Sequence, residues 1–375
     1  MKRLIPFTIL ALALLSIPGC KPKIASVIPT TLNLYVGTYT NGASQGIYLL
    51  KFDTITGQLK ADTLVATLNN PSYLTVSANK KYVAAISEDD SRAARLFTFL
   101  INPVTGHLSP TSEVETGGFG PCYVSTLGDT IICTANYRSG SVCFAQTDEN
   151  GKIADTPIQC FAHQGTGPNA QRQENPHAHS IIPDLDGKFV YSADLGADKV
   201  YVYRLQADST VLAKEIAVPA GAGPRHIAFH PGKKLMAVVN ELIPAVELYA
   251  KDDNGIFSQK TSSVSLLPDT VPDESTAADI HFSPDGKFVY ATNRGFDFIA
   301  TISVDEQNQT LQLIERNHGM LNWPRNFIIA PAGNFVLVAN QKGNNIVVFT
   351  RDAQTGKLLD TGHRFEIDSP VCLKF

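Results

Sequence analysis

The sequence predicts an all-β fold, a seven-bladed β-propeller, and three observations lead to this prediction. First, a unit of short apolar strands separated by turns recurs along the 375-residue chain. Second, the units start 46 to 55 residues apart, at positions 71, 121, 176, 224, 277, 324 and 370. Third, 22 prolines and 27 glycines are spread evenly between the strands as turn residues. A period of about 40 to 50 residues with several strands per period is typical of propeller blades.

The clearest copy of the unit covers residues 223–250. A Gly-Pro turn is followed by a short apolar strand, a Pro-Gly-Lys turn and a second apolar strand over 235–239, with a further strand-like run over 246–250. The other complete copies start at Asn70-Pro71, Gly120-Pro121, Asn175-Pro176, Thr276-Ala277, which has lost its proline, and Trp323-Pro324. Because the repeat is uninterrupted, we expect one large closed domain and not two domains.

The last unit, which starts at Pro370, is a fragment that ends at Phe375. The N-terminal segment supplies what it lacks, because residues 32–37 and 46–52 form two strand-like runs before a turn at Thr56-Gly57. We therefore expect one blade to contain strands from both chain termini, with residues 370–375 pairing with a strand from the first 60 residues. Closing the ring in this way removes free sheet edges.

Residues 1–20 predict export and do not belong to the fold. Lys2-Arg3 is a short basic start, an apolar run follows, and Gly19-Cys20 before polar residues resembles a bacterial lipoprotein cleavage site. The run is too short to span a membrane. We expect a lipoprotein signal peptide over 1–20, lipidation at Cys20, a tether over 21–30 and the propeller over 31–375. An ordinary signal peptide or an uncleaved anchor is the alternative.

This N-terminus predicts an exported bacterial lipoprotein on the periplasmic or cell-surface side of a membrane, attached through its lipid only. The net charge of −4 is small, and no basic patch is interleaved with aromatic residues, so we expect no nucleic-acid partner. We expect a monomer. Cysteines beyond Cys20 have no C-x-x-C spacing and are interpreted as small buried apolar residues, with a Cys133–Cys143 bridge between adjacent strands as the alternative.

Charged residues occupy two equivalent sets of positions in the repeat. The residue after the proline, or its equivalent, is Ser72, Cys122, His177, Arg225, Ala278, Arg325 or Val371. The end of the second strand carries Glu88, Tyr137, Asp194, Glu241, Arg294 or Gln341. In a propeller the first strand of each blade lines the central channel, and the second runs antiparallel to it, so both sets share one face.

This arrangement predicts a pocket at one mouth of the channel. It is surrounded by His177, Asp194, Arg225, Glu241, Arg294 and Arg325, with His179 on the same strand face as His177. Charged residues at strand ends are often only turn formers. A converging set of arginines, acids and a histidine is costly in a concave site unless the charges are paired or used, so we favour a functional pocket.

Other signals in the sequence are weaker. His177 and His179 with Glu174 could bind a metal ion, but the adjacent arginines would repel a cation, so we expect no metal and no cofactor. The chain lacks an H-E-x-x-H or P-loop motif. A polar connection over 162–175 precedes His177, and loops of this length inside a compact domain are often functional.

Several motifs together resemble those of one known family. They are Tyr35-Val36-Gly37-Thr38-Tyr39-Thr40, Asn175-Pro176-His177-Ala178-His179, Gly223-Pro224-Arg225-His226, Asn240-Glu241, Asn293-Arg294-Gly295 and Trp323-Pro324-Arg325-Asn326-Phe327. In order and spacing they resemble the seven-bladed propeller lactonase family, which includes propeller-type 6-phosphogluconolactonases and fungal carboxymuconate lactonising enzymes. The resemblance covers about residues 31 to 375.

The resemblance implies a hydrolase acting on a small anionic sugar lactone, with the proposed active-site residues of the family falling on His177, Arg225, Glu241 and Arg294. His177 or Glu241 would act as general base, and the two arginines would stabilise the oxyanion. Arg325 would bind the substrate's anionic group, with His179 and Asp194 beside it. A carboxymuconate-type cycloisomerase and a non-enzymatic, surface-anchored binding module are the alternatives. A phosphorylated sugar lactone is a cytoplasmic metabolite, so the predicted export leaves the substrate open.

Overall fold

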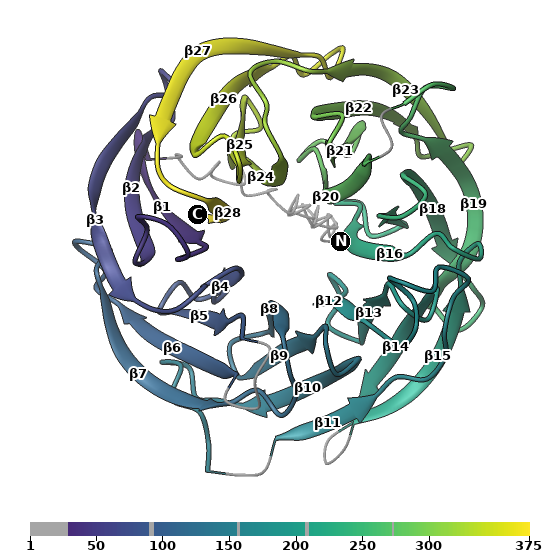
Figure 1. Cartoon of the computed structure of the whole chain (residues 1–375), viewed down its shortest axis with the longest axis horizontal. Helices are drawn as coiled ribbons and strands as arrows, with labels where there is room; N and C mark the ends of the chain where they lie inside the picture. The colour runs from purple at the N-terminus through teal and green to yellow at the C-terminus, as the bar shows by residue number, and fades with distance from the viewer. Residues whose placement is uncertain (1–28, 90–93, 156–157, 207–209, 272–273) are drawn as a thin grey trace, which may run out of the picture.

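The computed structural model describes residues 29–89, 94–155, 158–206, 210–271 and 274–375, and these form a seven-bladed β-propeller (Figure 1). The predicted all-β fold is confirmed, since the described residues contain seven four-stranded sheets arranged around a central channel. The predicted signal peptide, including Cys20, and most of the predicted tether lie outside the described residues. Within them, no helix is long and apolar enough to cross a membrane.

We number the blades from the N-terminus and give their strands from the channel outward. Blade 1 contains β28 (Pro370–Lys374), β1 (Thr31–Thr38), β2 (Gly46–Asp53) and β3 (Leu59–Thr67), and blade 2 contains β4 (Leu74–Val76), β5 (Tyr82–Ser87), β6 (Arg95–Ile101) and β7 (Leu108–Glu115). Blade 3 contains β8 (Pro121–Leu127), β9 (Ile131–Asn136), β10 (Ser141–Gln146) and β11 (Gln159–Ala162), and blade 4 contains β12 (Ala178–Pro183), β13 (Phe189–Asp194), β14 (Lys199–Leu205) and β15 (Thr210–Ala217).

Blade 5 contains β16 (Pro224–Phe229), β17 (Leu235–Asn240), β18 (Ala245–Lys251) and β19 (Phe257–Ser265), and blade 6 contains β20 (Thr276–Phe282), β21 (Phe288–Arg294), β22 (Phe298–Asp305) and β23 (Thr310–Asn317). Blade 7 contains β24 (Pro324–Ile329), β25 (Phe335–Asn340), β26 (Asn345–Arg351) and β27 (Leu358–Glu366). Each blade is antiparallel, so the first strand begins and the second strand ends at the same mouth of the channel.

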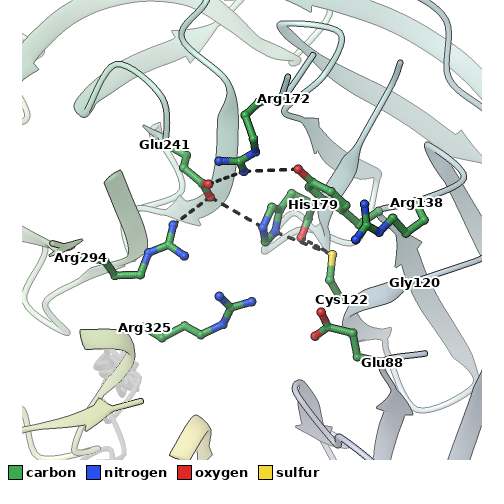
Figure 2. A pocket seen from close by; sticks show the side chains of 10 residues that line it. Glu88, Gly120, Cys122, Arg138, Arg172, His179, Glu241, Arg294 and Arg325 are labelled. Atoms are coloured by element: carbon green, nitrogen blue, oxygen red, sulfur yellow. Dashed lines mark hydrogen bonds and ion pairs between the residues drawn. The ribbon is translucent and has the colours of Figure 1, made fainter. Parts of the chain in front are cut away.

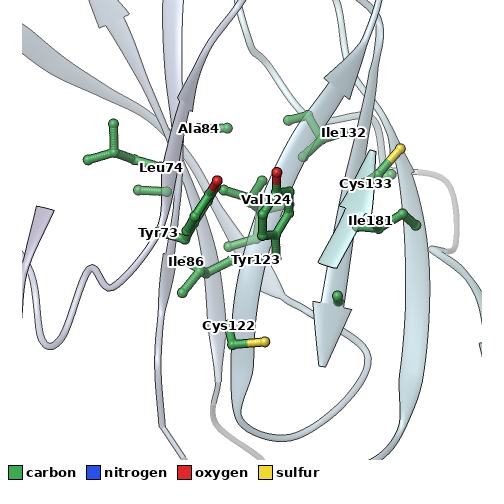
Figure 3. Close-up of a cluster of buried hydrophobic side chains, with 14 of the residues drawn as sticks. Tyr73, Leu74, Ala84, Ile86, Cys122, Tyr123, Val124, Ile132, Cys133 and Ile181 are labelled. Carbon is green, nitrogen blue, oxygen red and sulfur yellow. The ribbon is translucent and has the colours of Figure 1, made fainter. Parts of the chain in front are cut away.

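Apolar side chains fill the spaces between blades. Most of the second strands, such as β17 and β25, are buried along their whole length because a neighbouring blade covers each of their faces. The outermost strands, such as β7, alternate between partly buried and exposed residues because one face meets solvent. Between blades 2 and 3, Ala84 and Ile86 lie opposite Val124 and Ile132 in one continuous core (Figure 3).

The ring closes as predicted. Strand β28 pairs with β1, with Val36 opposite Leu373 and Gly37 opposite Cys372. Gly37 fits because the Cβ atom of any other residue would lie 2.3 Å from the backbone oxygen of Pro71. The first and last segments of the chain therefore share blade 1, which leaves no unpaired inner edge where the ring is closed.

A β-bulge near the start of the innermost strand sets which side chain reaches the channel mouth. In blade 5, Pro224 pairs with Asn240 and His226 with Val239, so Arg225 has no partner across the ladder. The bulged residues of blades 3, 4 and 7 are Cys122, His179 and Arg325. Bulges re-aim side chains in this way at the rims of closed sheets. We call these four residues the bulge tier.

The residues that follow the bulge positions form a second layer, deeper in the channel, which we call the channel tier. It consists of Tyr73, Tyr123, Ser180, His226, Asp279, Asn326 and Cys372, all of them buried. The rings of Tyr73 and Tyr123 stack with their centroids 4.0 Å apart (Figure 3), and the ring of His226 meets Tyr123 edge-on at 5.1 Å. Side chains therefore fill the channel beneath its mouth.

The alternative prediction of a Cys133–Cys143 bridge is wrong, as the strand register of blade 3 shows. Cys143 is disulfide-bonded to Cys160 on β11, its direct partner across the ladder, while Cys133 is a buried free thiol. Cys133 pairs with Phe144, and Cys143 pairs with Thr134. Side chains of directly paired residues share a face, so Cys133 and Cys143 lie on opposite faces of the sheet and cannot form a bond.

Candidate active site

A cavity of about 260 Å³ opens at the mouth of the channel where the innermost strands begin (Figure 2). It is lined by Glu88, Gly120, Cys122, Tyr137, Arg138, Arg172, His179, Glu241, Arg294 and Arg325. Three of these residues belong to the bulge tier, and Glu88, Tyr137, Glu241 and Arg294 stand at or just after the ends of second strands. The two sets of positions predicted from the repeat therefore do converge on one site.

Glu241 lies at the centre of the charged groups. Its Oε1 is 2.7 Å from Nη2 of Arg172, and its Oε2 is 2.9 Å from Nε of Arg225 and 3.0 Å from Nη2 of Arg294. Burial alone would raise the pKa of Glu241, but Arg294 and Arg225, with smaller contributions from His179 and Arg172, hold this pKa well below its usual range. Glu241 is therefore ionised throughout the neutral range.

Arg225, which is buried under the cavity, and Arg294, which lines it, are also held by backbone oxygens of β20. Nη1 of Arg225 donates a hydrogen bond to the carbonyl oxygen of Ala278 at 2.7 Å, and Nη2 of Arg294 donates to that of Ala277 at 2.8 Å. Burial lowers the pKa of Arg294 to about 9, against the opposing attraction of Glu241. Both guanidinium groups are cations at neutral pH, and their positions are fixed from two sides.

Arg325 differs from these arginines because it forms no ion pair with any residue of the described ranges. Its guanidinium lies 5.4 Å from the ring centroid of Tyr39, whose hydroxyl donates a hydrogen bond to Oε2 of Glu88 at 3.0 Å. Figure 2 shows this guanidinium pointing toward the middle of the cavity, between Arg294 and Cys122. A cation in this position is available to an anionic ligand.

His179 lies between a carboxylate and a thiol. Its Nε2 is 3.9 Å from Oε2 of Glu241, and its Nδ1 is 3.8 Å from Sγ of Cys122. Burial and the nearby Arg225 hold the pKa of His179 well below its usual range, so the imidazole is neutral at pH 7. Burial raises the pKa of Cys122, so this residue is a protonated thiol and a weak nucleophile.

Two predicted site residues, His177 and Asp194, do not line the cavity. The ring of His177 stacks behind that of Tyr137, with centroids 4.4 Å apart, and its Nδ1 lies 2.9 Å from the carbonyl oxygen of Tyr137. Asp194 accepts hydrogen bonds from the backbone N–H groups of His177 and Ala197 and from Nδ1 of His163, which is 2.6 Å away. Both residues support the wall behind the cavity.

The other predicted residues come together. His179, Glu241, Arg294 and Arg325 line the cavity, and Arg225 lies directly beneath it in contact with Glu241. His177 and His179 are separated by the ring of Tyr137, which meets His179 edge-on at 5.3 Å. Among the described residues, no group of three or more His, Cys, Asp or Glu side chains is placed to hold a metal ion.

Arg172, which comes from the polar connection before β12, was not among the predicted site residues. Next to it, the buried Gln173 anchors the connection, because its Nε2 donates to the carbonyl oxygen of Leu195 at 2.8 Å and to Oδ1 of Asp198 at 2.7 Å. The unusual length and polarity of the connection were the signal for Arg172. Glu88 and Tyr137 belonged to the second-strand series, while no pattern pointed to Arg138.

Comparisons with known proteins agree with this architecture. Residues 33–375 match the family model described as lactonase, seven-bladed β-propeller. The chain is 35% identical over 342 residues to the 6-phosphogluconolactonase of Bacillus subtilis strain 168, and this alignment covers 91% of this chain and 97% of that protein. It is 34% identical over 336 residues to the 6-phosphogluconolactonase of Formosa agariphila, which covers 87% of this chain and 94% of that protein.

A solved structure gives the same result. The periplasmic gluconolactonase of Pseudomonas aeruginosa superposes with a TM-score of 0.85 at 33% sequence identity, covering 92% of this chain and 99% of that one. The match to the family model extends over nearly the whole described propeller. The resemblance inferred from the motifs is thus confirmed, and the chain belongs to the seven-bladed β-propeller lactonase family.

Proposed function

We propose that this lactonase hydrolyses a sugar lactone at the channel mouth, with the anionic, 6-phosphorylated gluconolactone as the first candidate and the neutral, unphosphorylated gluconolactone as the second. The observation that carries this proposal is Arg325, a cation directed into the cavity without a carboxylate partner in the described residues. Both candidates are suggested by the names of the relatives, 6-phosphogluconolactonase and gluconolactonase.

The charge of the site supports an anionic ligand. Four arginines line the cavity and Arg225 lies under it, against two lining carboxylates, Glu88 and Glu241. Glu241 is already shared among three guanidinium groups. An additional negative charge, either on the substrate or on the carboxylate that hydrolysis releases, would be attracted to Arg325, which offers a planar fork of donors.

We assign the general base to His179 and not to His177 or Glu241. A neutral imidazole on the cavity wall can accept a proton from water, whereas His177 lies behind Tyr137. The carboxylate oxygens of Glu241 are already engaged by three guanidinium groups, so they are less available to a water molecule. That carboxylate, 3.9 Å from Nε2 of His179, would instead stabilise the imidazolium as it forms.

The reaction is a hydrolysis in two steps. The oxygen of a water molecule bonds to the lactone carbonyl carbon while His179 takes the water proton, and Arg294 stabilises the resulting oxyanion. The bond between the carbonyl carbon and the ring oxygen then breaks, and the proton on His179 passes to that oxygen. The product is an open-chain hydroxy acid. Its new carboxyl group loses the second water-derived proton to solvent and remains near the guanidinium groups as a carboxylate.

The test is a pH-stat assay of residues 31–375 with gluconolactone and its 6-phosphate, corrected for spontaneous opening. We expect turnover of at least one of them, and we expect Arg325→Ala to raise KM about tenfold or more with a smaller change in kcat, because it binds ground and transition states alike. If neither lactone is opened faster than in buffer, carboxymuconolactone is assayed for the cycloisomerase alternative. Failure of all three substrates would favour a binding module.

We also propose that the protein is an exported lipoprotein anchored at Cys20. A disulfide between Cys143 and Cys160 suits an oxidising compartment, and a relative of known structure is described as periplasmic. In a labelling experiment with radioactive palmitate, wild type should carry label and fractionate with membranes, and Cys20→Ser should carry none. A wild-type protein recovered unlabelled from the cytosol would contradict the proposal. The monomeric state stays a prediction, testable by light scattering.

A further inference from the structure

A buried pair of side chains below the cavity has no role in the proposed reaction. His226 and Asp279 belong to the channel tier, on the innermost strands of blades 5 and 6, and are 3% and 1% exposed. Their side chains lie 2.7 Å apart, between Nδ1 of His226 and Oδ1 of Asp279. Ionisable groups this deep in a protein are expensive unless they are paired or used.

The contacts of His226 define its tautomer. Nη1 of Arg225 lies 3.1 Å from Nε2 of His226, and a guanidinium group can only donate, so Nε2 must be the acceptor. The ring proton therefore sits on Nδ1, where it is donated to Asp279. Burial, together with the charge of Arg225, lowers the pKa of His226 to about 3, which keeps the ring neutral and this tautomer populated.

The carboxylate of Asp279 is held by donors from three strands, so its position is fixed and it can in turn fix the ring of His226. Its Oδ1 also accepts the backbone N–H of Ile280 at 3.0 Å. Its Oδ2 accepts Nε2 of His281 at 3.0 Å, Nδ2 of Asn326 at 2.5 Å and the backbone N–H of Phe327 at 3.2 Å. Asn326 in turn accepts the backbone N–H of Leu373 in the closing strand β28 at 2.7 Å, which joins this hub to blade 1.

Arg225 needs orientation from below, because its contact with Glu241 does not supply it. Nε of Arg225 and Oε2 of Glu241 are 2.9 Å apart, but neither atom forms a well-aligned hydrogen bond with any described residue. On its own, this Coulomb attraction without alignment would leave the guanidinium free to turn. The directional contacts are those of Nη1, with the carbonyl oxygen of Ala278 and with Nε2 of His226.

We propose that the His226–Asp279 pair orients the Arg225 guanidinium against Glu241, making His226 and Asp279 positioning residues of the active site. The arrangement is a carboxylate that fixes a histidine tautomer, as in a catalytic triad, but the histidine acts on an arginine and not on a nucleophile. The inference rests on the proposed lactonase function, since the consequence for the reaction is a correctly placed Arg225–Glu241–His179 group.

Two substitutions at one position separate the parts of this pair. His226→Asn keeps a donor near the place of Nδ1 for Asp279 but removes the acceptor for Arg225, while His226→Gln reaches Arg225 with an acceptor and loses the donor to Asp279. We expect kcat of His226→Asn to fall about tenfold to a hundredfold, the range for a displaced catalytic group, with KM changed less than about threefold. His226→Gln should keep most of kcat.

His281→Ala is the matched control, because it removes another donor to Asp279 without touching Arg225, and it should keep wild-type kcat. A purely structural role predicts the opposite order, with His226→Gln and His281→Ala losing activity together with melting temperature. Wild-type kcat in His226→Asn, or equal losses in His226→Asn and His226→Gln, would overturn the proposal.

A crystal structure of His226→Asn separates this inference from the proposed function. Nη1 of Arg225 should move away from its position over β20, whatever the substrate is. If the wild type opens no lactone, the proposed function fails while this structural result still tests the orientation of Arg225. An Arg225 side chain unchanged in the variant would sink the inference even if lactonase activity is found.

Discussion

Blades 4 and 5 are neighbours built on the same four-stranded plan, but the chain enters them differently. It reaches β16 of blade 5 through a short link after β15, and Pro224 pairs with Asn240. It reaches β12 of blade 4 through residues 163–177, which include most of the polar connection, and there Ala178 pairs with Asp194. The proline of blade 4, Pro176, therefore stands two residues ahead of the position that Pro224 holds.

This displacement decides which side chains reach the cavity. The bulged residue is Arg225 in blade 5 and His179 in blade 4, one residue after the first residue of the ladder in both. At the second-strand end, Asp194 is equivalent to Asn240, so the position of Glu241 is taken in blade 4 by the buried Leu195. Ladder register, and not the distance from a proline, thus locates functional residues in this propeller.

The largest expected effect comes from comparing substitutions of the two histidines at the entry to blade 4. His179→Gln should lower kcat by about a hundredfold to ten-thousandfold, the usual contribution of a general base. His177→Gln should stay within about threefold of wild type, because its ring lies behind Tyr137. Steady-state kinetics with the lactone identified in the pH-stat assay measures both. A greater loss in His177→Gln would return the base to the residue after the proline.

Alanine substitutions at the equivalent second-strand ends of blades 4 and 5 should differ in their effect on the free energy of unfolding. Asp194→Ala leaves three buried donors unsatisfied, on His163, His177 and Ala197, and each orphaned donor costs about 1 kcal/mol or more. We expect a loss of about 3 kcal/mol in the free energy of unfolding, measured with urea. Asn240→Ala should cost about 1 kcal/mol, since its carboxamide oxygen has no hydrogen-bond partner in the described structure. Equal losses would show that the two ends are anchored alike.

Much of this molecule could be predicted from the repeat, because turns and apolar strands are local and recur seven times. The blade number, the closure by residues 370–375 and the convergence of Arg225, Glu241, Arg294 and Arg325 followed from spacing alone. Bulges are different. The position of a bulge depends on the pairing between strands, which the sequence of one strand does not report. The bulged residue was therefore predicted from its distance to a proline, and this prediction was wrong in blade 4.

The disulfide and Arg172 were missed for related reasons. A disulfide requires a shared sheet face, and the face of Cys143 depends on the register of β10 against its neighbours. Arg172 reaches Glu241 only because the buried Gln173 fixes the polar connection against blade 4. Both depend on contacts between segments far apart in the sequence, which periodicity does not describe.

The channel tier provides a smaller contrast, because blade 5 has His226 where blade 4 has Ser180. The pKa of His226 is about 3 in the folded protein, below its ordinary value of about 6.5, so the unfolded chain binds a proton that the folded protein does not. Stability must therefore fall as the pH drops from about 6.5 toward 3, and this single group should cost about 2 kcal/mol at pH 5.

This prediction can be isolated although other groups also titrate. The groups around His226 are Arg225, Asp279, His179, Tyr73 and Tyr123. Urea unfolding of wild type and His226→Asn at pH 8 and pH 5 gives the difference due to His226, since the remaining groups are common to both. The variant should lose about 2 kcal/mol less than wild type between the two pH values. Identical pH dependence would contradict a buried neutral His226.

The smallest expected effect concerns the contribution of the polar connection to the site of its neighbour. Arg172 from the entry to blade 4 pairs with Glu241 of blade 5, but its side chain is 38% exposed, so solvent weakens the pair. Glu241 would still hold Arg225 and Arg294 after Arg172→Ala. We therefore expect kcat/KM to fall only about tenfold, with the free energy of unfolding changed by less than about 1 kcal/mol.

Gln171→Ala, an exposed neighbour of Arg172 in the same connection, is the control and should match wild type. The decrease should shrink as salt is raised, because screening already weakens the pair in the wild type. A loss as large as that of His179→Gln would mean that Arg172 contacts the reacting group directly, and that the connection into blade 4 is part of the catalytic apparatus and not only a support for Glu241.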